Sequence, residues 1–384
     1  MPFSELQLQL DERAAQGLLR KRYTVSSPHT TQLVVDEKQY ISFCSNDYLG
    51  LASHPQIIEA LKHGTERYGV GAGAAHLVSG HSIAHEQLEN ELATFIGKPS
   101  ALLFSTGYMA NLGAVQALVS REDTVFADKL NHASLNDAML LSRAKVKRYQ
   151  HCDMAQLSAM LSETRSGRKL ICTDAVFSMD GDRAPLPELL ALCEKHDAWL
   201  LVDDAHGFGA SGIDGRGSLS HFGVESERII YMATLGKAAG VSGAFVAAEK
   251  VVIDTLINNA KSYIYTTATP PALSVALSES LRLMADGDAL RGHLQKLIAQ
   301  LREGLKGLPW SLMESSTAIQ PLMIGDNQAA LDISVALRER GIWVAAIRPP
   351  TVPVGTARLR ITLSAAHTVS DVDRLIEALY ELAR

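Results

Sequence analysis

Residues 199–207 read WLLVDDAHG, an apolar run that ends abruptly in two carboxylates and an imidazole. Similar runs recur from about residue 100 onward and alternate with segments of helical period, which predicts strands joined by crossover helices. The candidate strands are Ala101–Phe104, Thr124–Ala127, Lys169–Cys172, Trp199–Val202, Ile229–Ala233 and Gly243–Ala248. Because several of them lack polar alternation, both faces should be covered. We expect an α/β fold with a mostly parallel central sheet flanked by helices.

Helical segments surround these strands and suggest how the chain is divided. The expected helices are Ile83–Ile96, Ala272–Met284, Leu290–Leu305 and Val369–Leu382. Ser82 is placed to cap the start of the first helix and Gly97 its end. After Pro270 and Pro271 the helices lead into short strands and a final helix. We expect an N-terminal helix and extended segment over residues 1–45, a large domain over 46–284 and a smaller C-terminal α/β domain over 285–384.

The composition argues against several classes of protein. The 384 residues carry a formal net charge of -6, whereas a nucleic-acid binder needs clustered basic side chains. The uncharged stretch Pro99–Ser120 contains polar residues and glycines, so we interpret it as a strand, a turn and a helix rather than a membrane span. The four cysteines lie at least twenty positions apart, which suggests neither a zinc motif nor a disulfide framework. The N-terminal residues lack the pattern of a secretory signal, so we expect a cytoplasmic protein.

Lys237 is the only charged residue between Arg228 and Glu249, within the segment TLGKAAGVSG at 234–243. Small apolar neighbours predict a largely desolvated amine. Desolvation lowers the pKa of a lysine, and each unit favours the neutral amine by about 1.4 kcal/mol. A buried lysine that can lose its proton is what Schiff-base chemistry requires. The alternative is a lysine on a surface turn whose charged end reaches solvent.

Asp203, Asp204 and His206 follow a buried-strand pattern directly. In open parallel sheets, ligands bind beyond the carboxyl ends of the strands. A carboxylate there would keep a pyridine nitrogen protonated, and His206 would reach a neighbouring ring oxygen. The structural alternatives are a helix N-cap for Asp204 and a hydrogen-bonded core histidine for His206. A metal centre of a hydrolase, built from these residues and His132, also stays open, although it leaves Lys237 unexplained.

Two further segments follow apolar strands. Residues 104–111, FSTGYMAN, predict a strand, a turn and a helix start whose backbone N–H groups would bind an anion. The helix dipole supplies only about 0.3 to 2 kcal/mol, so further donors are needed, and the candidates are Thr234, Thr266 and Thr267. Residues 128–134, DKLNHAS, place His132 where it would lie flat on a planar ring, cap a helix or remain at the surface.

Arg358 and Arg360 share one face of a predicted strand in the segment RLRIT at 358–362. The guanidinium fork binds carboxylates bidentately, so a carboxylate substrate is suggested, with a solvated strand face as the alternative.

Two motifs that would indicate other classes of enzyme are incomplete in this sequence. Residues 69–74, GVGAGA, lack the third glycine of a dinucleotide loop. Residues 80–84, GHSIA, have alanine in the last place of a nucleophile elbow.

Taken together, these blocks resemble the pyridoxal-phosphate enzymes of aspartate aminotransferase fold type, fold type I, and within them the α-oxoamine synthases. The resemblance runs from about Leu10 to the C-terminus. It rests on SNDYLGL at 45–51, DKLNHAS at 128–134, VFSMDGD at 176–182, VDDAHG at 202–207, TLGK at 234–237 and IRPPTVPVGTARLRITLSAAH at 347–367. The last block is similar to the family members of biotin biosynthesis.

The resemblance implies roles for residues around the cofactor. Lys237 would form the covalent link to pyridoxal 5'-phosphate and later move the α-proton of the substrate. Asp203 would pair with the pyridinium nitrogen, and His206, with Ser178 nearby, would contact the ring hydroxyl. His132 would stack on the ring and face the substrate.

The resemblance also implies phosphate and substrate contacts. The backbone of Gly107 and Tyr108 and the hydroxyl of Thr234 would bind the phosphate, and Thr267 would reach it from the partner subunit of a homodimer. The expected substrate contacts are Arg360 with Asn46 for the amino-acid carboxylate, and Arg20 with Thr351 for the acyl substrate.

The implied reaction is a decarboxylative condensation of L-alanine with a pimeloyl thioester, on CoA or on an acyl-carrier protein. The alternative within the family is a relative that uses glycine or serine with another acyl-CoA, such as 2-amino-3-ketobutyrate CoA ligase. Two features depart from the family pattern. Asp174 stands where relatives usually have glutamate, and the stretch Ala72–His76 is rich in alanine and carries a histidine. Both bear on substrate preference more than on reaction class.

Overall fold

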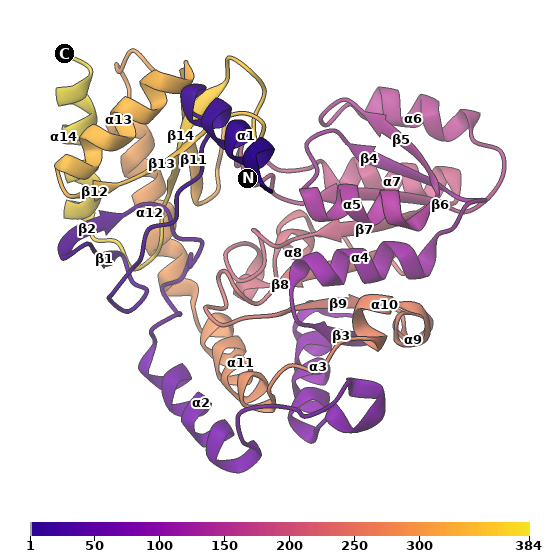
Figure 1. Ribbon diagram of the computed structural model, residues 1–384. Helices are drawn as coiled ribbons and strands as arrows, with labels where there is room; N and C mark the ends of the chain where they lie inside the picture. Colours follow the sequence, from indigo (N-terminus) through magenta and orange to yellow (C-terminus); the bar gives the residue numbers. More distant parts are fainter. Residues whose placement is uncertain (1) are drawn as a thin grey trace. The chain divides into compact units, whose positions relative to one another are not determined.

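The computed structural model describes residues 2–384, which form two compact units (Figure 1). The large unit comprises Asp47–Ser178 and Asp182–Arg291. The small unit comprises residues 2–46, Met179–Gly181 and Gly292–Arg384. The domain boundaries expected from the sequence remain a proposal. No helix within residues 2–384 combines the length and hydropathy needed to cross a membrane.

A seven-stranded sheet forms the centre of the large unit, with its strands in the order β3-β9-β8-β7-β6-β4-β5. Their bounds are β3 Ser100–Phe104, β4 Thr124–Asp128, β5 Lys145–Tyr149, β6 Lys169–Asp174, β7 Trp199–Asp203, β8 Ile229–Thr234 and β9 Ala244–Ala248. Strands β5, β4, β6, β7 and β8 pair in parallel, whereas β9 is antiparallel to both of its neighbours. The expected mostly parallel sheet is therefore confirmed, and all six predicted strands are present.

The strand β5 is the one member of this sheet that the sequence pattern did not reveal. Three of its five residues, KVKRY, are charged, and only Tyr149 is buried. It pairs with β4 alone, at the edge of the sheet. Charged side chains are a common protection of an edge strand, and they hide it from a search for apolar runs.

Helices surround the large sheet; some pack on its strands and others pack mainly on other helices (Figure 1). They are α2 Pro55–Tyr68, α3 Ile83–Ile96, α4 Gly107–Leu118, α5 Ala133–Ser142, α6 Met154–Glu163, α7 Leu186–His196, α8 Ser218–Phe222, α9 Lys250–Asn259, α10 Lys261–Ile264 and α11 Pro271–Ala285, with short turns of helix at His76–Gly80 and Ile213–Gly215. The helix α3 has the predicted bounds. Ser82 precedes it, and Gly97 ends it in the left-handed conformation, with φ of 74°.

The core of the large unit lies on both faces of the central strands. Leu200, Leu201 and Val202 of β7 are fully buried, as are Val125 and Phe126 of β4. Strands covered on both faces need no polar alternation, which explains the uninterrupted apolar runs of the sequence. The polar residues that end these strands are therefore placed by a rigid frame.

The small unit contains two small sheets and helices around them. One sheet has the order β10-β11-β14-β13 and the other β1-β2-β12. The strands are β1 Gln32–Val35, β2 Lys38–Ser42, β10 Ser311–Leu312, β11 Ile319–Gly325, β12 Ile342–Trp343, β13 Ala345–Ile347 and β14 Ala357–Thr362. The helices are α1 Ser4–Ala15, α12 Asp288–Gly304, whose first turn belongs to the large unit, α13 Asn327–Glu339 and α14 Val369–Leu382.

Gly64 lets α2 pack closely against α11, and its replacement by alanine should destabilise the large unit. A Cβ at this position would lie 2.9 Å from Cα of Ala272 and 3.0 Å from Cβ of Val275. Overpacking costs about 1 to 3 kcal/mol, which outweighs the gain in helix propensity of about 1 kcal/mol. We expect Gly64→Ala to lower the free energy of unfolding, measured by urea titration.

Gly292→Ala in α12 is the control, because nothing lies within 4 Å of its added Cβ. This variant should gain about 0.5 to 1 kcal/mol from helix propensity alone. Equal effects of the two substitutions would contradict the packing argument.

Candidate functional site

A cavity of about 200 Å³ lies in the large unit at the carboxyl ends of the parallel strands. It is lined by Gly107, Tyr108, His132, Ser134, Asp174, Ser178, Asp203, Ala205, His206, Met232, Thr234 and Lys237. Eight of these residues carry a cofactor role predicted from the sequence. The parallel order of β6, β7 and β8 brings them together, because all three strands end at the same edge of the sheet.

Asp203 is the last residue of β7, and its carboxylate is buried in the cavity wall with an exposed fraction of 4%. One oxygen accepts a hydrogen bond from Nδ2 of Asn111 at 2.7 Å and the other from the backbone N–H of Ala205 at 3.0 Å. Asn111 also donates to Oγ of Ser134 at 2.9 Å. Within residues 2–384, Asp203 forms no ion pair with a cation. Buried carboxylates are normally paired, so this one is suited to a cationic group of a ligand.

Lys237 reaches the same cavity and contacts His206. Its Nζ lies 2.8 Å from Nε2 of His206. The other ring nitrogen of His206 is 2.5 Å from the hydroxyl of Tyr48. Lys237 is half-buried, which is less enclosed than its apolar sequence neighbours predicted, because its amine faces the cavity. Tyr48 was not predicted as a site residue, although it belongs to the block SNDYLGL.

His132 caps the start of α5, which confirms one of its predicted readings, and it also lines the cavity, whereas its stacking on a ring stays a prediction. Its Nδ1 accepts the backbone N–H of Ser134 at 3.2 Å, at the start of α5. Its own backbone N–H donates to Asp174 at 2.7 Å. Burial lowers the pKa of His132, against the opposing effect of Asp203. The imidazole is therefore neutral near neutral pH, as a group that stacks on an aromatic ring can be.

Asp174, the last residue of β6, contacts the segment before α5 that carries His132. It is buried, and burial together with the nearby Asp203 holds the pKa of its carboxyl well above the ordinary value. Burial therefore favours the protonated form of the Asp174 carboxyl. Its hydrogen bond with the backbone of His132 fixes the position of the imidazole.

The helix α4 begins at the cavity wall with Gly107 and Tyr108. Thr106 caps it, accepting the N–H of Met109 at 3.1 Å. The first N–H groups of a helix have no partner within the helix, so this end favours an anion. Thr234, at the end of β8, lines the same wall. Gly107, Tyr108 and Thr234, which are predicted to bind an anion, thus line the cavity together, whereas Thr266 and Thr267 do not line it.

Asp204 faces away from the cavity and has a structural role. It accepts hydrogen bonds from the backbone N–H and the hydroxyl of Ser218, both at 2.6 Å, and from Tyr231 at 2.9 Å. Burial raises the pKa of Asp204 to about 6. It anchors the start of α8 rather than capping the helix of its own segment. Asp204 does not line the cavity, so the structure does not bring together there the four residues of the metal centre considered from the sequence.

A second cluster, of His76, His81 and His85, lies in the same unit, with Nδ1 of the first two 3.0 Å apart. His85 uses both ring nitrogens for structure, since Nδ1 accepts the N–H of Ser82 at 3.0 Å and Nε2 bonds to the carbonyl of Thr269 at 2.8 Å. Two imidazoles remain. The cluster therefore lacks the three available nitrogens of a histidine metal site.

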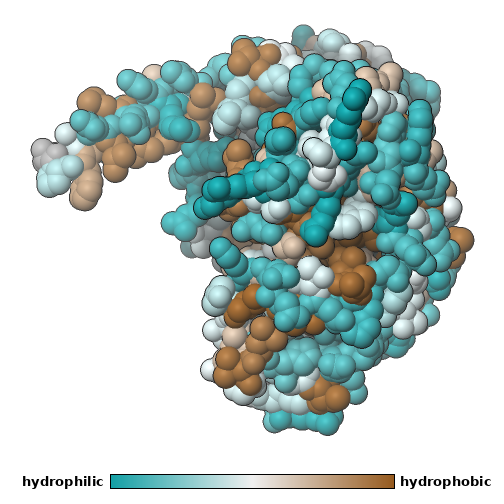
Figure 2. Space-filling model, turned by 90° about the vertical axis from the view of Figure 1, so that its right-hand side faces the viewer, coloured by the Kyte–Doolittle hydropathy of each residue, from teal (hydrophilic) through white to brown (hydrophobic). Residues whose placement is uncertain are grey.

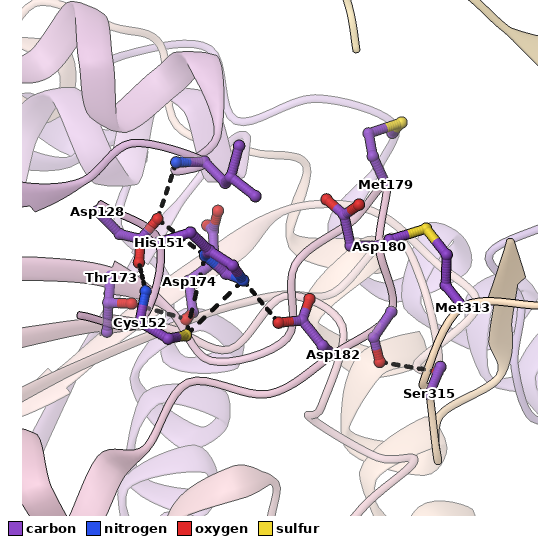
Figure 3. A network of polar contacts seen from close by, with 12 residues as sticks. Asp128, His151, Cys152, Thr173, Asp174, Met179, Asp180, Asp182, Met313 and Ser315 are labelled. Atoms are coloured by element: carbon purple, nitrogen blue, oxygen red, sulfur yellow. Dashed lines mark hydrogen bonds and ion pairs between the residues drawn. The ribbon is translucent and has the colours of Figure 1, made fainter. Parts of the chain in front are cut away.

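His151 lies between the two carboxylates of Asp128 and Asp182 (Figure 3). Its Nδ1 is 3.0 Å from Asp128 and its Nε2 is 2.7 Å from Asp182. Burial alone would lower the pKa of His151, but these two hydrogen bonds raise it to about 12. The resulting imidazolium ties the end of β4 to the segment after β6. Sequence reasoning missed it, because its partners lie 23 and 31 positions away.

The predicted substrate residues form two pairs within the small unit. Both nitrogens of the Arg360 guanidinium approach Oδ1 of Asn46, at 3.3 and 3.2 Å. Nη2 of Arg20 lies 3.5 Å from the hydroxyl of Thr351. Thr267, by contrast, is exposed and does not line the cavity of its own chain.

Arg358 and Arg360 are both buried on β14, with exposed fractions of 3% and 7%. The alternative of a solvated strand face is therefore wrong. Arg358 forms an ion pair with Asp180 and also contacts the carbonyl of Met179. The two arginines thus have different surroundings despite their shared strand face.

Comparison with known proteins identifies relatives over nearly the full length. Residues 38–379 match the family aminotransferase class I and II. An 8-amino-7-oxononanoate synthase from Nitrosospira multiformis is 60% identical over 375 residues, 98% of this chain and 95% of that protein.

Two solved structures share the fold. Serine palmitoyltransferase from S. paucimobilis, with a bound PLP–myriocin aldimine, has a TM-score of 0.93 at 29% identity, covering 99% of this chain and 97% of that one. An 8-amino-7-oxononanoate synthase from Francisella tularensis has a TM-score of 0.79 at 32% identity, covering 89% and 97%. These relatives confirm the fold expected from the sequence.

The His151 network predicts a pH-dependent contribution to stability. A histidine whose pKa is raised on folding stabilises fully below its unfolded pKa, about 6.5, and the contribution is lost as the pH rises toward 12. We expect His151→Gln to lower the free energy of unfolding most at pH 6 and less at pH 9, measured by urea titration. His63→Gln is the control, because that side chain is 82% exposed. If His151→Gln lowered the free energy of unfolding equally at pH 6 and pH 9, His151 would not be an imidazolium in the folded protein.

Proposed function

Since the chain belongs to the 8-amino-7-oxononanoate synthases of the aminotransferase class I and II family, we propose that it condenses L-alanine with a pimeloyl thioester. The products are 8-amino-7-oxononanoate, carbon dioxide and a free thiol, in a step of biotin biosynthesis. The observation that carries the proposal is the buried carboxylate of Asp203, which has no cation partner within residues 2–384 and shares a cavity with the amine of Lys237.

Pyridoxal 5'-phosphate is the cofactor that these residues fit. Asp203 would pair with its protonated ring nitrogen, and His206 with Ser178 would contact its ring hydroxyl. The start of α4 at Gly107 and Tyr108 and the hydroxyl of Thr234 would hold its phosphate. When bound, the cofactor accepts the electrons that remain at the α-carbon of an attached amino acid after a bond breaks.

Lys237 would be the attachment point and the base that moves the α-proton of alanine. Its amine is positioned by His206, which Tyr48 in turn orients through a hydrogen bond. The hydrogen-bonded chain restricts the amine to one side of the cavity, which is a positioning effect on proton transfer. His132, neutral and fixed by Asp174, would cover the ring and face the substrate.

Arg360, supported by Asn46, would bind the carboxylate of alanine. Its fork of N–H donors matches a carboxylate. Arg358 is a weaker candidate, because Asp180 already occupies its guanidinium. Arg20 and Thr351, which contact one another, would bind the acyl substrate.

A homodimer with shared sites is part of the proposal. Thr267 is exposed and would serve the cavity of the partner subunit. None of the residues of α1 is buried. Phe3, just before this helix, and Leu6 and Leu8 within it are exposed by 74%, 55% and 63%. Figure 2 shows hydrophobic residues on the surface of one face of the molecule. Apolar side chains left uncovered in one chain support an additional contact. A cytoplasmic location is also proposed, since all four cysteines are free.

The reaction is tested with a panel of amino acids and thioesters. We expect purified protein with pyridoxal phosphate to release thiol from pimeloyl-CoA in the presence of L-alanine, with a product of the mass of 8-amino-7-oxononanoate. Glycine, L-serine and acetyl-CoA are the controls. Faster turnover of glycine or serine with acetyl-CoA would instead assign another α-oxoamine synthase activity.

Lys237→Ala should abolish turnover and the covalent link to the cofactor, because no other amine lines the cavity in residues 2–384. Borohydride reduction of the loaded enzyme followed by peptide mass analysis locates the link. Lys250→Ala, an exposed lysine paired with Asp254, is the control and should behave as the unaltered enzyme does. A reduced adduct on any lysine other than Lys237 would overturn the assignment.

A further inference from the structure

His132 and Ser178 both line the cavity, but they come from different segments of the large unit. His132 lies between β4 and α5, and Ser178 lies in the turn after β6. Both side chains are expected to contact the ring of the cofactor, so the distance between the two segments has to match that ring. His151, which follows β5, is not among the described residues that line this cavity. It is nevertheless hydrogen-bonded to a carboxylate in each of the two segments (Figure 3).

Asp128 connects His151 to the segment that carries His132. It is the last residue of β4, and only 1% of its side chain is exposed. One carboxylate oxygen lies 3.0 Å from Nδ1 of His151 and accepts the backbone N–H of Leu130 at 2.8 Å. The other oxygen accepts the backbone N–H of Cys152 at 2.8 Å. The turn that leads to His132 is thus held by a carboxylate that His151 and its neighbour orient.

The turn that carries Ser178 is held at its base by the other side of the His151 ring. The backbone N–H of Phe177 donates to the carbonyl of Asp182 at 3.0 Å, which joins the two ends of this turn. Nε2 of His151 lies 2.7 Å from the carboxylate of Asp182. The rings of His151 and Phe177 meet edge to face, with their centres 4.4 Å apart. His151 therefore contacts the chain on both sides of Ser178.

The positive charge of His151 strengthens its contacts with both segments. Burial lowers the pKa of His151, but the hydrogen bonds to Asp128 and Asp182 raise it to about 12. Hydrogen bonds between ionised groups are about twice as strong as those between neutral groups. Within residues 2–384, neither carboxylate has another ion-pair partner. Loss of the imidazolium would therefore leave two carboxylates without a counter-charge.

We propose that His151 is a positioning residue of the cofactor site, which holds the segments of His132 and Ser178 at the separation that the cofactor ring requires. The inference rests on the proposed function, because both side chains would contact the cofactor of that reaction. Ring stacking and hydrogen bonding both depend strongly on distance. A shift of either segment would therefore weaken the contacts with the ring. His151 would act through the two segments and touch neither cofactor nor substrate.

His151→Gln tests this role in the folded protein. Glutamine carries no charge, so Asp128 and Asp182 both lose their counter-charge. We expect the affinity of the folded apoenzyme for pyridoxal 5'-phosphate to fall by about tenfold, the size expected from the loss of one hydrogen bond to a charged group. Calorimetric titration with pyridoxal 5'-phosphate measures this affinity without any substrate. An affinity equal to that of the unaltered protein overturns the proposal.

Gly64→Ala is the matched control for loss of stability. It overpacks the contact between α2 and α11 in the same unit, and Gly64 does not line the cavity. A residue that only stabilises the fold would lower the free energy of unfolding without changing the cofactor affinity of the folded protein. We expect Gly64→Ala to bind pyridoxal 5'-phosphate as the unaltered protein does. Equal losses of affinity in Gly64→Ala and His151→Gln overturn the proposal.

Asp182→Asn separates the two sides of the network, and it tests the proposal even if His151→Gln does not fold. It keeps the contact between His151 and Asp128 but removes the charge that holds the turn of Ser178. A hydroxyl that donates to the ring oxygen of the cofactor favours the ionised oxygen. Displacement of Ser178 should therefore raise the pH midpoint of the visible absorption band of the bound cofactor, by about half a pH unit.

Asp197→Asn is the control for this measurement. Asp197 is 89% exposed and pairs with Arg228 at 2.7 Å, in the same unit but away from the cavity lining. Its substitution also removes one carboxylate of an ion pair, and it should leave the pH midpoint unchanged. An unchanged midpoint in Asp182→Asn, or an equal shift in both variants, overturns the proposal.

Failure of this inference is distinguishable from failure of the proposed function. The unaltered protein has to bind pyridoxal 5'-phosphate and develop the visible absorption band. Absence of this binding refutes the proposed function and, with it, the role of His151. Binding by the unaltered protein without the expected changes in His151→Gln and Asp182→Asn refutes the positioning role alone.

Discussion

The buried carboxylate of Asp203 is the constraint on which the site depends. Removing a carboxylate from water is costly unless a cation or sufficient donors replace the solvent. Here an amide side chain and one backbone N–H are the donors, at 2.7 and 3.0 Å. The fold therefore maintains a carboxylate whose electrostatic compensation is incomplete within the protein. A ligand with a protonated ring nitrogen would supply the positive charge that Asp203 lacks. The affinity for the cofactor would therefore depend on this incompletely compensated carboxylate at the end of β7.

The sheet turns local sequence patterns into this arrangement. Uninterrupted apolar strands must be buried on both faces, so the polar residue that ends each strand is the first able to meet a ligand. This is why Asp203, Thr234 and the segment before α5 could be predicted from sequence. The bounds of α3 and α14 were equally predictable, because caps and helical period are local signals. The specific roles came from the resemblance to a family, since spacing alone left structural alternatives open.

The interactions that tune the site could not be predicted, because they join residues far apart in the chain. Tyr48 and His206 are 158 positions apart, and Asn111 and Asp203 are 92 apart. Neither the tyrosine in the segment SNDYLGL nor the asparagine in α4 has a local sequence feature that identifies its hydrogen-bond partner. The same holds for His151, whose partners come from separate strand ends. Even the strand β5 escaped, because its edge position favours charged side chains over an apolar run.

Arg358 and Arg360 show what a periodic sequence pattern predicts, namely a shared strand face, and what it does not predict, namely the partners of each side chain. Alternation placed both on one strand face, and the structure agrees that both belong to β14. Burial of two guanidiniums on a central strand then requires separate compensation for each. A carboxylate from the segment Met179–Gly181 compensates Arg358, whereas the amide of Asn46 and the hydroxyl of Thr362 contact Arg360. A guanidinium already joined to a carboxylate has less to gain from a substrate carboxylate. The difference between a structural and a substrate-binding arginine therefore arises from tertiary partners, not from the strand that carries them.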